Sequence, residues 1–299
     1  MSNVLIVKLN ATGDVVRTTA LLRRLQGDIT WITAKGNVPL LDGIRSGMRV
    51  LTWDDRARAL DRAYDLVISL EDEAETAAFL RDVRHDRLFG ASLAPDGTVQ
   101  YSDDAREWFD MSLISRFGRQ RADELKLLNR RSYQEMIFAG LGYRFDNEAY
   151  VLPRPPKTDL QGDVAVAPVA GPVWPMKNWA YYDELIERLG AAGLKVNVLP
   201  KRASLLEHLG DIANHRCLVG GDSLPMHLAL GMGVQCVTLF NCTSPWEIHD
   251  YGLQTKLISP LLGEFFYKRG MDPRATTAIT LDQVFDAVMA RLNQASAAS

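Results

Sequence analysis

Cysteine is scarce in this chain, and its placement excludes two common uses of the residue. The 299 residues include three cysteines, Cys217, Cys236 and Cys242. No two of them have the CxxC spacing of a zinc knuckle, and three thiols confined to the second half do not suggest a disulfide framework. We therefore expect reduced thiols, as in a cytosolic protein, and no metal site.

Long apolar runs and an excess of positive charge are also absent. No stretch approaches the ~20 apolar residues of a membrane span, and the first apolar run, 4–7, is too short for the core of a signal peptide. The net charge is −3, so no overall positive field attracts nucleic acid. We expect a cytoplasmic protein without a nucleic-acid partner and with at most a peripheral contact to the inner membrane face.

Length and hydrophobic pattern predict two α/β domains. The 299 residues exceed the roughly 100–200 residues of one domain. Short apolar runs typical of buried parallel strands alternate with segments of helical periodicity. The strands are expected at 4–9, 29–33, 50–53, 66–70, 164–167, 195–199, 216–219 and 234–240.

This alternation predicts an open, doubly wound sheet in each half. The proline-rich segment 152–157 is the expected linker, so the domains would be 1–155 and 156–299. The first domain is expected to carry a helical insertion near 95–145, with helices at 103–117 and 132–141 separated by a charged stretch.

The first predicted strand leads into a Gly-Asp turn. Gly13 permits a backbone bend or a close approach, and Asp14 lies at the start of a helix, whose dipole favours a carboxylate. The carboxyl edge of a parallel sheet is where α/β proteins bind ligands. Asp14 is thus either a ligand-facing carboxylate or a helix N-cap with no other role. The turn matches neither a GxGxxG fingerprint nor a Walker loop.

A second turn follows the predicted strand 216–219. After two glycines the chain offers Asp222 and Ser223, and a helix begins near Pro225. The free amides at a helix start bind diphosphate well. Asp222 would repel phosphate, so it suits the hydroxyls of an adjoining sugar, while His227 lies one helical turn further on. The alternative is that Asp222 is a cap and His227 an interior histidine.

Two further segments offer charge for an anionic ligand. Lys177 stands between Trp174 and Trp179 and could act as a point-charge phosphate ligand; the tryptophans would line a pocket or pack in the core. The run 116–131 gathers six cations, Arg116, Arg119, Arg121, Lys126, Arg130 and Arg131. It suits an anionic acceptor such as a phosphorylated lipid-linked glycan, or it is simply a solvated helix face.

Four segments together resemble one known family. The segment 5–19 resembles an opening strand with a Gly-Asp turn and first helix, and Lys177-Asn178-Trp179 a Lys-x-Trp motif. The segment 221–229 resembles a donor-binding Asp-[Ser/Thr]-Gly-x-x-His-Leu motif, and 240–245 with Tyr251-Gly252 a Phe-Gly-x-Thr-x-Pro…Tyr-Gly block. In order and spacing they are similar to the ADP-heptose:lipopolysaccharide heptosyltransferases, glycosyltransferase family 9.

The resemblance implies a GT-B fold, in which two Rossmann-like domains face each other across a cleft, acceptor on the first and donor on the second. It implies an inverting, metal-independent transfer of a heptose-like sugar without a cofactor. The expected donor is a nucleotide-diphosphate sugar, with ADP-heptose as the first candidate. The acceptor would be a glycan or lipopolysaccharide-type molecule, anionic or lipid-linked.

The resemblance also assigns roles to residues. Asp14 would be the general base. Lys177, Ser223 and the helix amides would stabilise the departing diphosphate, and Asp222 would hold sugar hydroxyls. The full set of expected donor-side residues is Lys177, Asp222, Ser223, Leu224, His227 and Thr243, and that of acceptor-side residues is Thr12, Gly13, Arg116, Arg119 and Arg121.

Departures from the family pattern leave the nucleotide and the sugar open. Leu224-Pro225 stands where many relatives have glycine, Asn241 replaces the glycine after Phe240, and 200–202 offers no acid for ribose hydroxyls. Two other functions stay possible for such a fold. One is a GT-B-shaped nucleotide-sugar epimerase or hydrolase, and the other is a non-catalytic nucleotide- or glycan-binding protein.

Overall fold

A computed structural model describes residues 2–297, with side chains up to residue 294. The chain divides into two compact units, Met1–Pro153 and Arg154–Ser299, and the division falls in the proline-rich segment 152–157. Within the described part, no helix combines the length and apolar character that crossing a bilayer requires.

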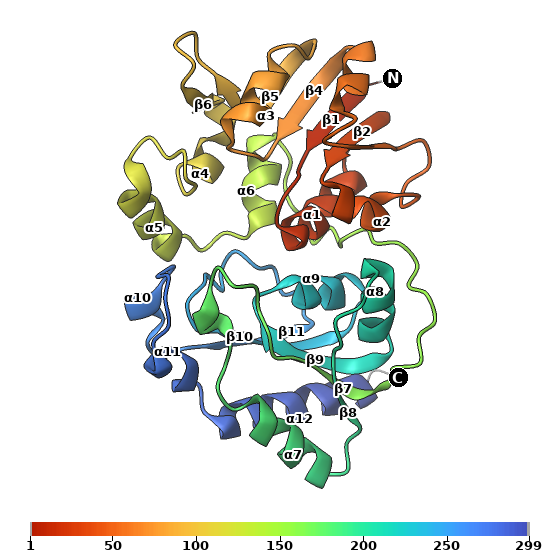
Figure 1. The fold of residues 1–299 in the computed structure, drawn as a ribbon, viewed down its shortest axis with the longest axis vertical. Coiled ribbons are helices and arrows are strands. Elements are labelled where there is room, and N and C mark those ends of the chain that lie inside the picture. Colours follow the sequence, from red (N-terminus) through yellow and green to blue (C-terminus); the bar gives the residue numbers. More distant parts are fainter. Residues whose placement is uncertain (1, 298–299) are drawn as a thin grey trace. The chain divides into compact units, whose positions relative to one another are not determined.

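Unit 1 is built on a six-stranded sheet with the order β3-β2-β1-β4-β5-β6 (Figure 1). Its strands are β1 Asn3–Val7, β2 Asp28–Thr33, β3 Arg49–Thr52, β4 Tyr64–Ser69, β5 His85–Leu93 and β6 Val99–Tyr101. The first five are parallel, and β6 pairs antiparallel with β5. The central strand β1 is buried from Val4 to Val7, as expected of a strand covered on both faces.

Short helices connect these strands. They are α1 Thr12–Thr18, α2 Val38–Leu41, α3 Ala74–Leu80, α4 Arg106–Phe109, α5 Gly118–Leu128 and α6 Tyr133–Gly140, with 3-10 turns η1 Thr19–Arg23, η2 Lys35–Asn37, η3 Arg56–Asp61 and η4 Asp103–Ala105. The helix expected at 132–141 is confirmed as α6, which begins with a Ser132–Glu135 capping box.

The expected helix at 103–117 is wrong beyond Phe109, and the charged stretch expected to separate two helices is itself α5. Only Ala122 is fully buried in α5. The surface of this helix carries the ion pairs Arg119–Asp123 and Arg121–Glu124, spaced four and three residues apart. Such pairs support a helix locally.

Unit 2 is a five-stranded parallel sheet with the order β11-β10-β9-β7-β8. Its strands are β7 Gly162–Ala167, β8 Val196–Val198, β9 His215–Gly221, β10 Gln235–Phe240 and β11 Gln254–Ile258. Its helices are α7 Tyr182–Ala191, α8 Leu205–Ala213, α9 Leu224–Gly231, α10 Leu262–Phe265, α11 Pro273–Thr277 and α12 Leu281–Ala297, with η5 Pro175–Lys177.

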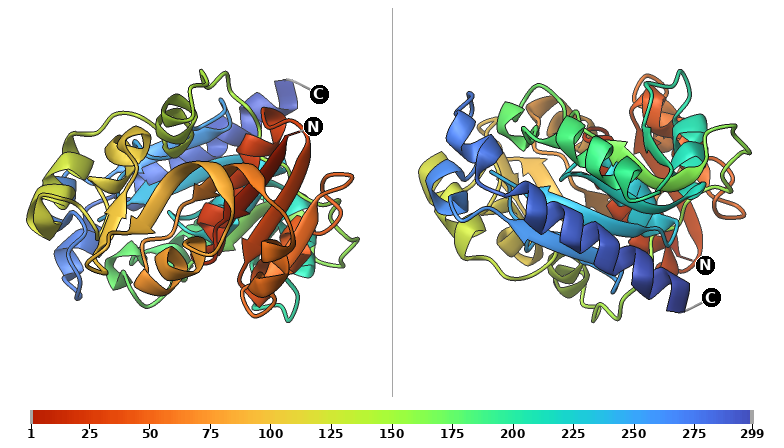
Figure 2. Two further views of the ribbon diagram at one scale, coloured as in Figure 1. Left: turned by 90° about the horizontal axis from the view of Figure 1, so that it is seen from above. Right: turned by 90° about the horizontal axis from the view of Figure 1, so that it is seen from below.

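Helices cover both faces of this sheet. α7 and α12 pack along one face around Leu185, Val237 and Val288 (Figure 2, right). On the other face, α8 and α9 pack against each other, and α9 contacts β9 and β10. The three cysteines are buried and free. Each unit is a doubly wound α/β domain, as predicted.

Candidate functional site

The loop that follows β1 places Asp14 inside a helix rather than at its cap. α1 begins at Thr12, its N-cap is Ala11, and no side chain caps it. Asp14 is the third helical residue, so the interpretation of Asp14 as the N-cap is wrong. The bend that we expected at Gly13 is made by Ala11, whose φ of 54° costs a residue with a Cβ about 1–3 kcal/mol.

Two cations flank the Asp14 carboxylate. Arg17 donates to its Oδ1 from Nε at 3.0 Å and lies 2.7 Å from it through Nη2, while Lys8 Nζ lies 4.0 Å from Oδ2. The side chain of Asp14 is 27% exposed, whereas those of Lys8 and Arg17 are 7% and 9% exposed. The carboxylate is thus held by buried cations and is itself open to solvent.

The cation Lys8 is held in turn by a buried acid that the sequence reasoning missed. Lys8 Nζ donates to Glu71 Oε1 at 2.8 Å. The same oxygen accepts the amides of Leu9 at 2.6 Å and Asn10 at 3.3 Å. Glu71 therefore fixes both Lys8 and the strained loop that leads into Ala11. Burial, then repulsion by Glu71 and Asp72, raises the pKa of the neighbouring Glu73.

Two polar side chains anchor the ends of this loop. Buried Asn37 donates to the Leu9 carbonyl at 2.7 Å and accepts a hydrogen bond from Thr12 Oγ1 at 2.8 Å. Thr12, an expected acceptor-side residue, thus has a supporting contact within unit 1. Farther along α1, Thr18 Oγ1 donates to the Asp14 carbonyl at 2.6 Å.

Tyr133 of α6 contacts two residues of α1 next to Asp14. Its ring lies 4.0 Å from the Arg17 guanidinium carbon, a cation–π contact, and its hydroxyl lies 2.6 Å from Thr18 Oγ1. Burial, followed by the negative charge of Asp14, raises the pKa of Tyr133, so the phenol stays protonated and donates to Thr18. The Arg17 guanidinium is therefore held by the Tyr133 ring as well as by the Asp14 carboxylate.

In unit 2 the structure joins two candidate residues that lie far apart in sequence. Lys177 Nζ donates to the Asp222 carbonyl at 2.7 Å and to its Oδ2 at 3.1 Å. Their side chains are 14% and 16% exposed. The two glycines before Asp222 lie close to neighbouring backbone. A Cβ on Gly220 would lie 3.1 Å from the Ala167 carbonyl oxygen, and one on Gly221 3.1 Å from that of Lys177.

The start of α9 lies directly beyond this ion pair. Its N-cap is Ser223, so the interpretation of Asp222 as the cap is wrong, and the Ser223 side chain does not cap the helix either. Ser223 Oγ donates to the Gly221 carbonyl at 3.3 Å. The Leu224 amide has no partner inside the helix, whereas Pro225 has no N–H and the Met226 amide donates to the Ser223 carbonyl at 3.1 Å. His227 is buried in the next turn.

The loop after β10 brings Thr243 to the same edge of the sheet. Asn241 Nδ2 donates to the Met176 carbonyl at 3.0 Å, which ties this loop to the segment of Lys177. Among the described residues, Thr243 Oγ1, Asn241 Oδ1 and Ser244 Oγ are buried without a hydrogen-bond partner. Each such atom costs about 1–3 kcal/mol until a partner arrives. Thr243 thus lies at the edge of the sheet where Lys177 and Asp222 meet, but its hydroxyl is buried.

Cys242, between these residues, is not a nucleophile. Burial raises the pKa of its thiol to about 11, although Lys177 lowers it somewhat. Within the described residues, no three side chains of His, Cys, Asp or Glu gather as a metal site requires.

The three arginines expected on the acceptor side are neutralised within unit 1. Arg116 forms two hydrogen bonds with Asp110, at 3.1 and 2.7 Å. Arg119 and Arg121 pair with Asp123 at 3.0 Å and Glu124 at 2.9 Å. These pairs weaken the positive field on which the expectation of an anionic acceptor rested, and the acceptor role of the arginines stays a prediction.

Comparisons with known proteins point to one family. The model of glycosyltransferase family 9 (heptosyltransferase) matches residues 173–263, which include Lys177, Asp222 and Thr243. No curated protein matches by sequence. The chain therefore carries a family 9 domain in unit 2, which confirms the resemblance inferred from the motifs and identifies a glycosyltransferase.

Solved structures extend the likeness to both units. E. coli heptosyltransferase WaaC with ADP-2-deoxy-2-fluoro heptose has a TM-score of 0.62 and 17% identity, over 96% of this chain and 99% of WaaC. E. coli ADP-heptose lps heptosyltransferase II gives 0.61 and 16%, over 99% and 100%. Iron-containing dodecameric TibC, from enterotoxigenic E. coli, gives 0.61 and 13%, over 99% and 77%. At these identities, the structures establish the fold, and they confirm the predicted GT-B class.

Proposed function

We propose that this heptosyltransferase-family glycosyltransferase transfers a heptose-like sugar, with inversion and without a metal, from ADP-heptose to a glycan or lipopolysaccharide-type acceptor. The observation that carries the proposal is the Lys177–Asp222 pair beside the start of α9. The ADP-sugar in the WaaC structure supports the choice of donor. Such an acceptor would be met at the cytoplasmic face of a membrane, through a peripheral contact.

The donor side supplies what a departing diphosphate needs. Negative charge grows on the phosphate oxygens as the anomeric C–O bond breaks, and a fixed cation with preoriented amides stabilises that charge. Lys177 provides the cation, and the amides of Ser223 and Leu224 provide the donors. Asp222 holds Lys177 and has carboxylate oxygens suited to sugar hydroxyls. These groups would take the place of a metal ion.

The acceptor side supplies a base. In the proposed step, the acceptor hydroxyl loses its proton to an Asp14 oxygen while its own oxygen forms a bond to the anomeric carbon. The diphosphate leaves from the opposite face with the bonding electron pair, so the configuration inverts. Lys8 and Arg17 keep the carboxylate in one orientation during this step, and Thr12 and Gly13 line the same turn.

The substitution Asp14→Asn tests the role of the base. The amide has nearly the same shape but cannot take the proton, so the transfer rate should fall about 10²–10⁴-fold with donor binding unchanged. The assay is product formation from ADP-heptose, with binding measured by calorimetry and the anomeric configuration by NMR. Retained transfer would refute the assignment of Asp14. Absence of nucleotide-sugar binding in the unsubstituted protein would instead refute the donor site.

Metal independence has its own test in the same assay. Treatment with EDTA should leave the rate unchanged, because Lys177 and the α9 amides carry the phosphate charge. A loss of activity that a divalent cation restores would contradict this part of the proposal while leaving the transferase reaction intact.

A further inference from the structure

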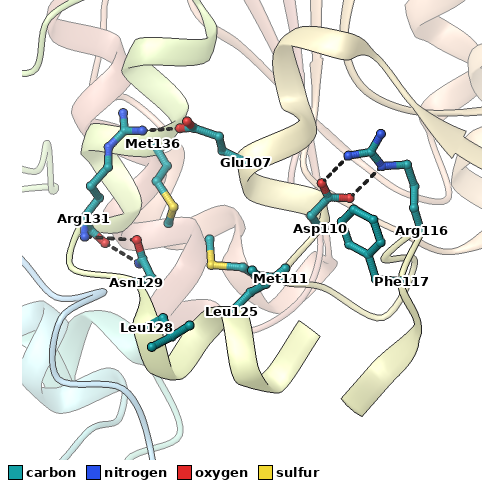
Figure 3. Close-up of a pocket in the computed structure, with 10 residues that line it drawn as sticks. All are labelled: Glu107, Asp110, Met111, Arg116, Phe117, Leu125, Leu128, Asn129, Arg131 and Met136. Atoms are coloured by element: carbon teal, nitrogen blue, oxygen red, sulfur yellow. Dashed lines mark hydrogen bonds and ion pairs between the residues drawn. The ribbon is translucent and has the colours of Figure 1, made fainter. Parts of the chain in front are cut away.

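Unit 1 contains a pocket that the proposed reaction does not use. It has a volume of about 400 Å³ and lies among α4, α5 and α6 (Figure 3). Its apolar lining includes Met111 and Met136, both buried, and Leu125 of α5. A volume in this range is that of a small-molecule site, and methionine side chains adapt to irregular apolar ligands.

The mouth of the pocket leaves apolar surface in water. Phe117 and Leu128, which line it, are 55% and 66% exposed. Around them, α5 buries only Ala122 fully, and its leucines are half-buried or exposed. Exposed apolar side chains grouped around a concave site are typical of a place where an apolar ligand binds.

The rim of the pocket is charged but electrically balanced. Arg116 is bound to Asp110 by two hydrogen bonds, and Arg131 pairs with Glu107. Figure 3 shows the two pairs on either side of the apolar side chains. Because each charge is already matched, the rim favours neither an anion nor a cation. It offers donors and acceptors together, which is the complement of hydroxyl groups.

We infer that this pocket binds the apolar chain of a hydroxyl-bearing amphiphile, such as an alkylated or acylated sugar, and that uncharged hydroxyl groups next to the chain contact the rim. The chain lies on Met111 and Met136, and the sugar hydroxyls bond to the Asp110–Arg116 and Glu107–Arg131 pairs. The inference rests on the proposed function in one respect, which is that the bound molecule is part of the sugar acceptor. Binding to the pocket is independent of donor and transfer, so the two can fail separately.

The methyl groups of the methionines report on the pocket directly. In protein labelled with ¹³C at the methionine methyls, decyl maltoside below its critical micelle concentration should shift the signals of Met111 and Met136 in a saturable manner. Met176 and Met226, buried in unit 2, serve as internal controls. Each added methylene should tighten binding up to about fourfold as the chain lengthens from octyl to decyl, and maltose alone should have no effect.

Two tryptophan substitutions provide matched variants. Leu125→Trp places a ring in the pocket and should weaken binding at least tenfold. Leu113→Trp adds the same ring at an exposed position between α4 and α5 that does not line the pocket. This variant should bind as the unsubstituted protein does. The chain-length series keeps the test valid if Leu125→Trp fails to fold.

Three results would overturn the inference. A response only above the critical micelle concentration would mean adsorption to an assembled lipid-like surface. Equal binding by the two tryptophan variants would place the ligand elsewhere. Tenfold tighter binding of decanoate than of decyl maltoside would show that the rim selects an anion.

Discussion

Removing the charge of Glu71 should destabilise unit 1 and impair transfer together. Glu71→Gln keeps an oxygen that accepts the loop amides, but it takes the counter-charge from Lys8, which is 2.8 Å away and almost fully buried. Removing one partner of a buried pair costs about 3–5 kcal/mol. Asp14, 4.0 Å from Lys8, retains part of the attraction, so we expect a loss of about 2–3 kcal/mol, against a total stability of about 5–15 kcal/mol.

The activity should fall because Lys8 then has Asp14 as its nearest carboxylate. The proposed base is drawn toward the cation, so kcat should decrease while the affinity for the donor, bound by unit 2, stays the same. The measurement is kcat with saturating donor, together with hydrogen exchange of the β1 amides in urea, which reports the opening of unit 1 alone.

A double-mutant cycle with Lys8→Met decides whether the pair is the cause. The combined variant buries neither charge, so it should be more stable than the sum of the single effects predicts, by about 2 kcal/mol. Residues in direct contact show interaction energies of about 0.5–3 kcal/mol. Additive effects within about 0.5 kcal/mol would refute the reasoning, because they would show that Glu71 acts on the loop without Lys8.

Three further predictions concern unit 2. Lys177→Met should lower kcat about 10²–10³-fold, measured with ADP-heptose, and an unchanged kcat would remove Lys177 from the reaction. Gly221→Ala should weaken donor binding about tenfold, since its Cβ would press on the Lys177 carbonyl at 3.1 Å; calorimetry tests this, with the exposed Gly263→Ala as control. Burial alone would raise the pKa of Asp211, but hydrogen bonds from Arg202 and Thr158 lower this pKa below its usual 3.8. The folded state thus favours the ionised Asp211 carboxylate. The stability that this carboxylate contributes is present above pH ~4 and is lost as the pH falls through the lowered pKa. In an acid titration, the stability of Asp211→Asn should fall less steeply than that of the unsubstituted protein. Identical curves for the two proteins would contradict the link between Asp211 and acid stability.

The strand order explains which parts of the site were predictable from the sequence. Lys177 and Asp222 were found because they belong to recognisable turns, but their contact depends on the pairing of β7 with β9. Glu71 was missed for the same reason. β4 pairs in parallel with β1, with Val7 opposite Ser69, and two residues further on this register sets Leu9 beside Glu71. Residues that follow adjacent parallel strands meet at one edge, yet sequence alone does not tell which strands are adjacent.

The fold was predictable where strands are continuous apolar runs, and less so elsewhere. β5 begins with His85-Asp86-Arg87, all exposed, and only Phe89 to Ala91 are buried in it, so its pattern is not that of a central strand. β11 lies at the edge of its sheet and is mostly half-buried. α5 was mistaken for a separator because its stability rests on surface ion pairs. In each case the missing signal is an apolar pattern.

The two contacts between Lys177 and Asp222 bear on how the donor would be recognised. Lys177 binds Asp222 through two different atoms, the carbonyl oxygen and Oδ2. In the proposed reaction, a diphosphate can replace Oδ2 as the counter-charge of Lys177 while the carbonyl still holds the ammonium in place. The released carboxylate then accepts hydroxyls from the sugar attached to that diphosphate. Binding of the phosphate thus prepares the sugar contact, and a free sugar, which leaves the ion pair closed, should be bound weakly.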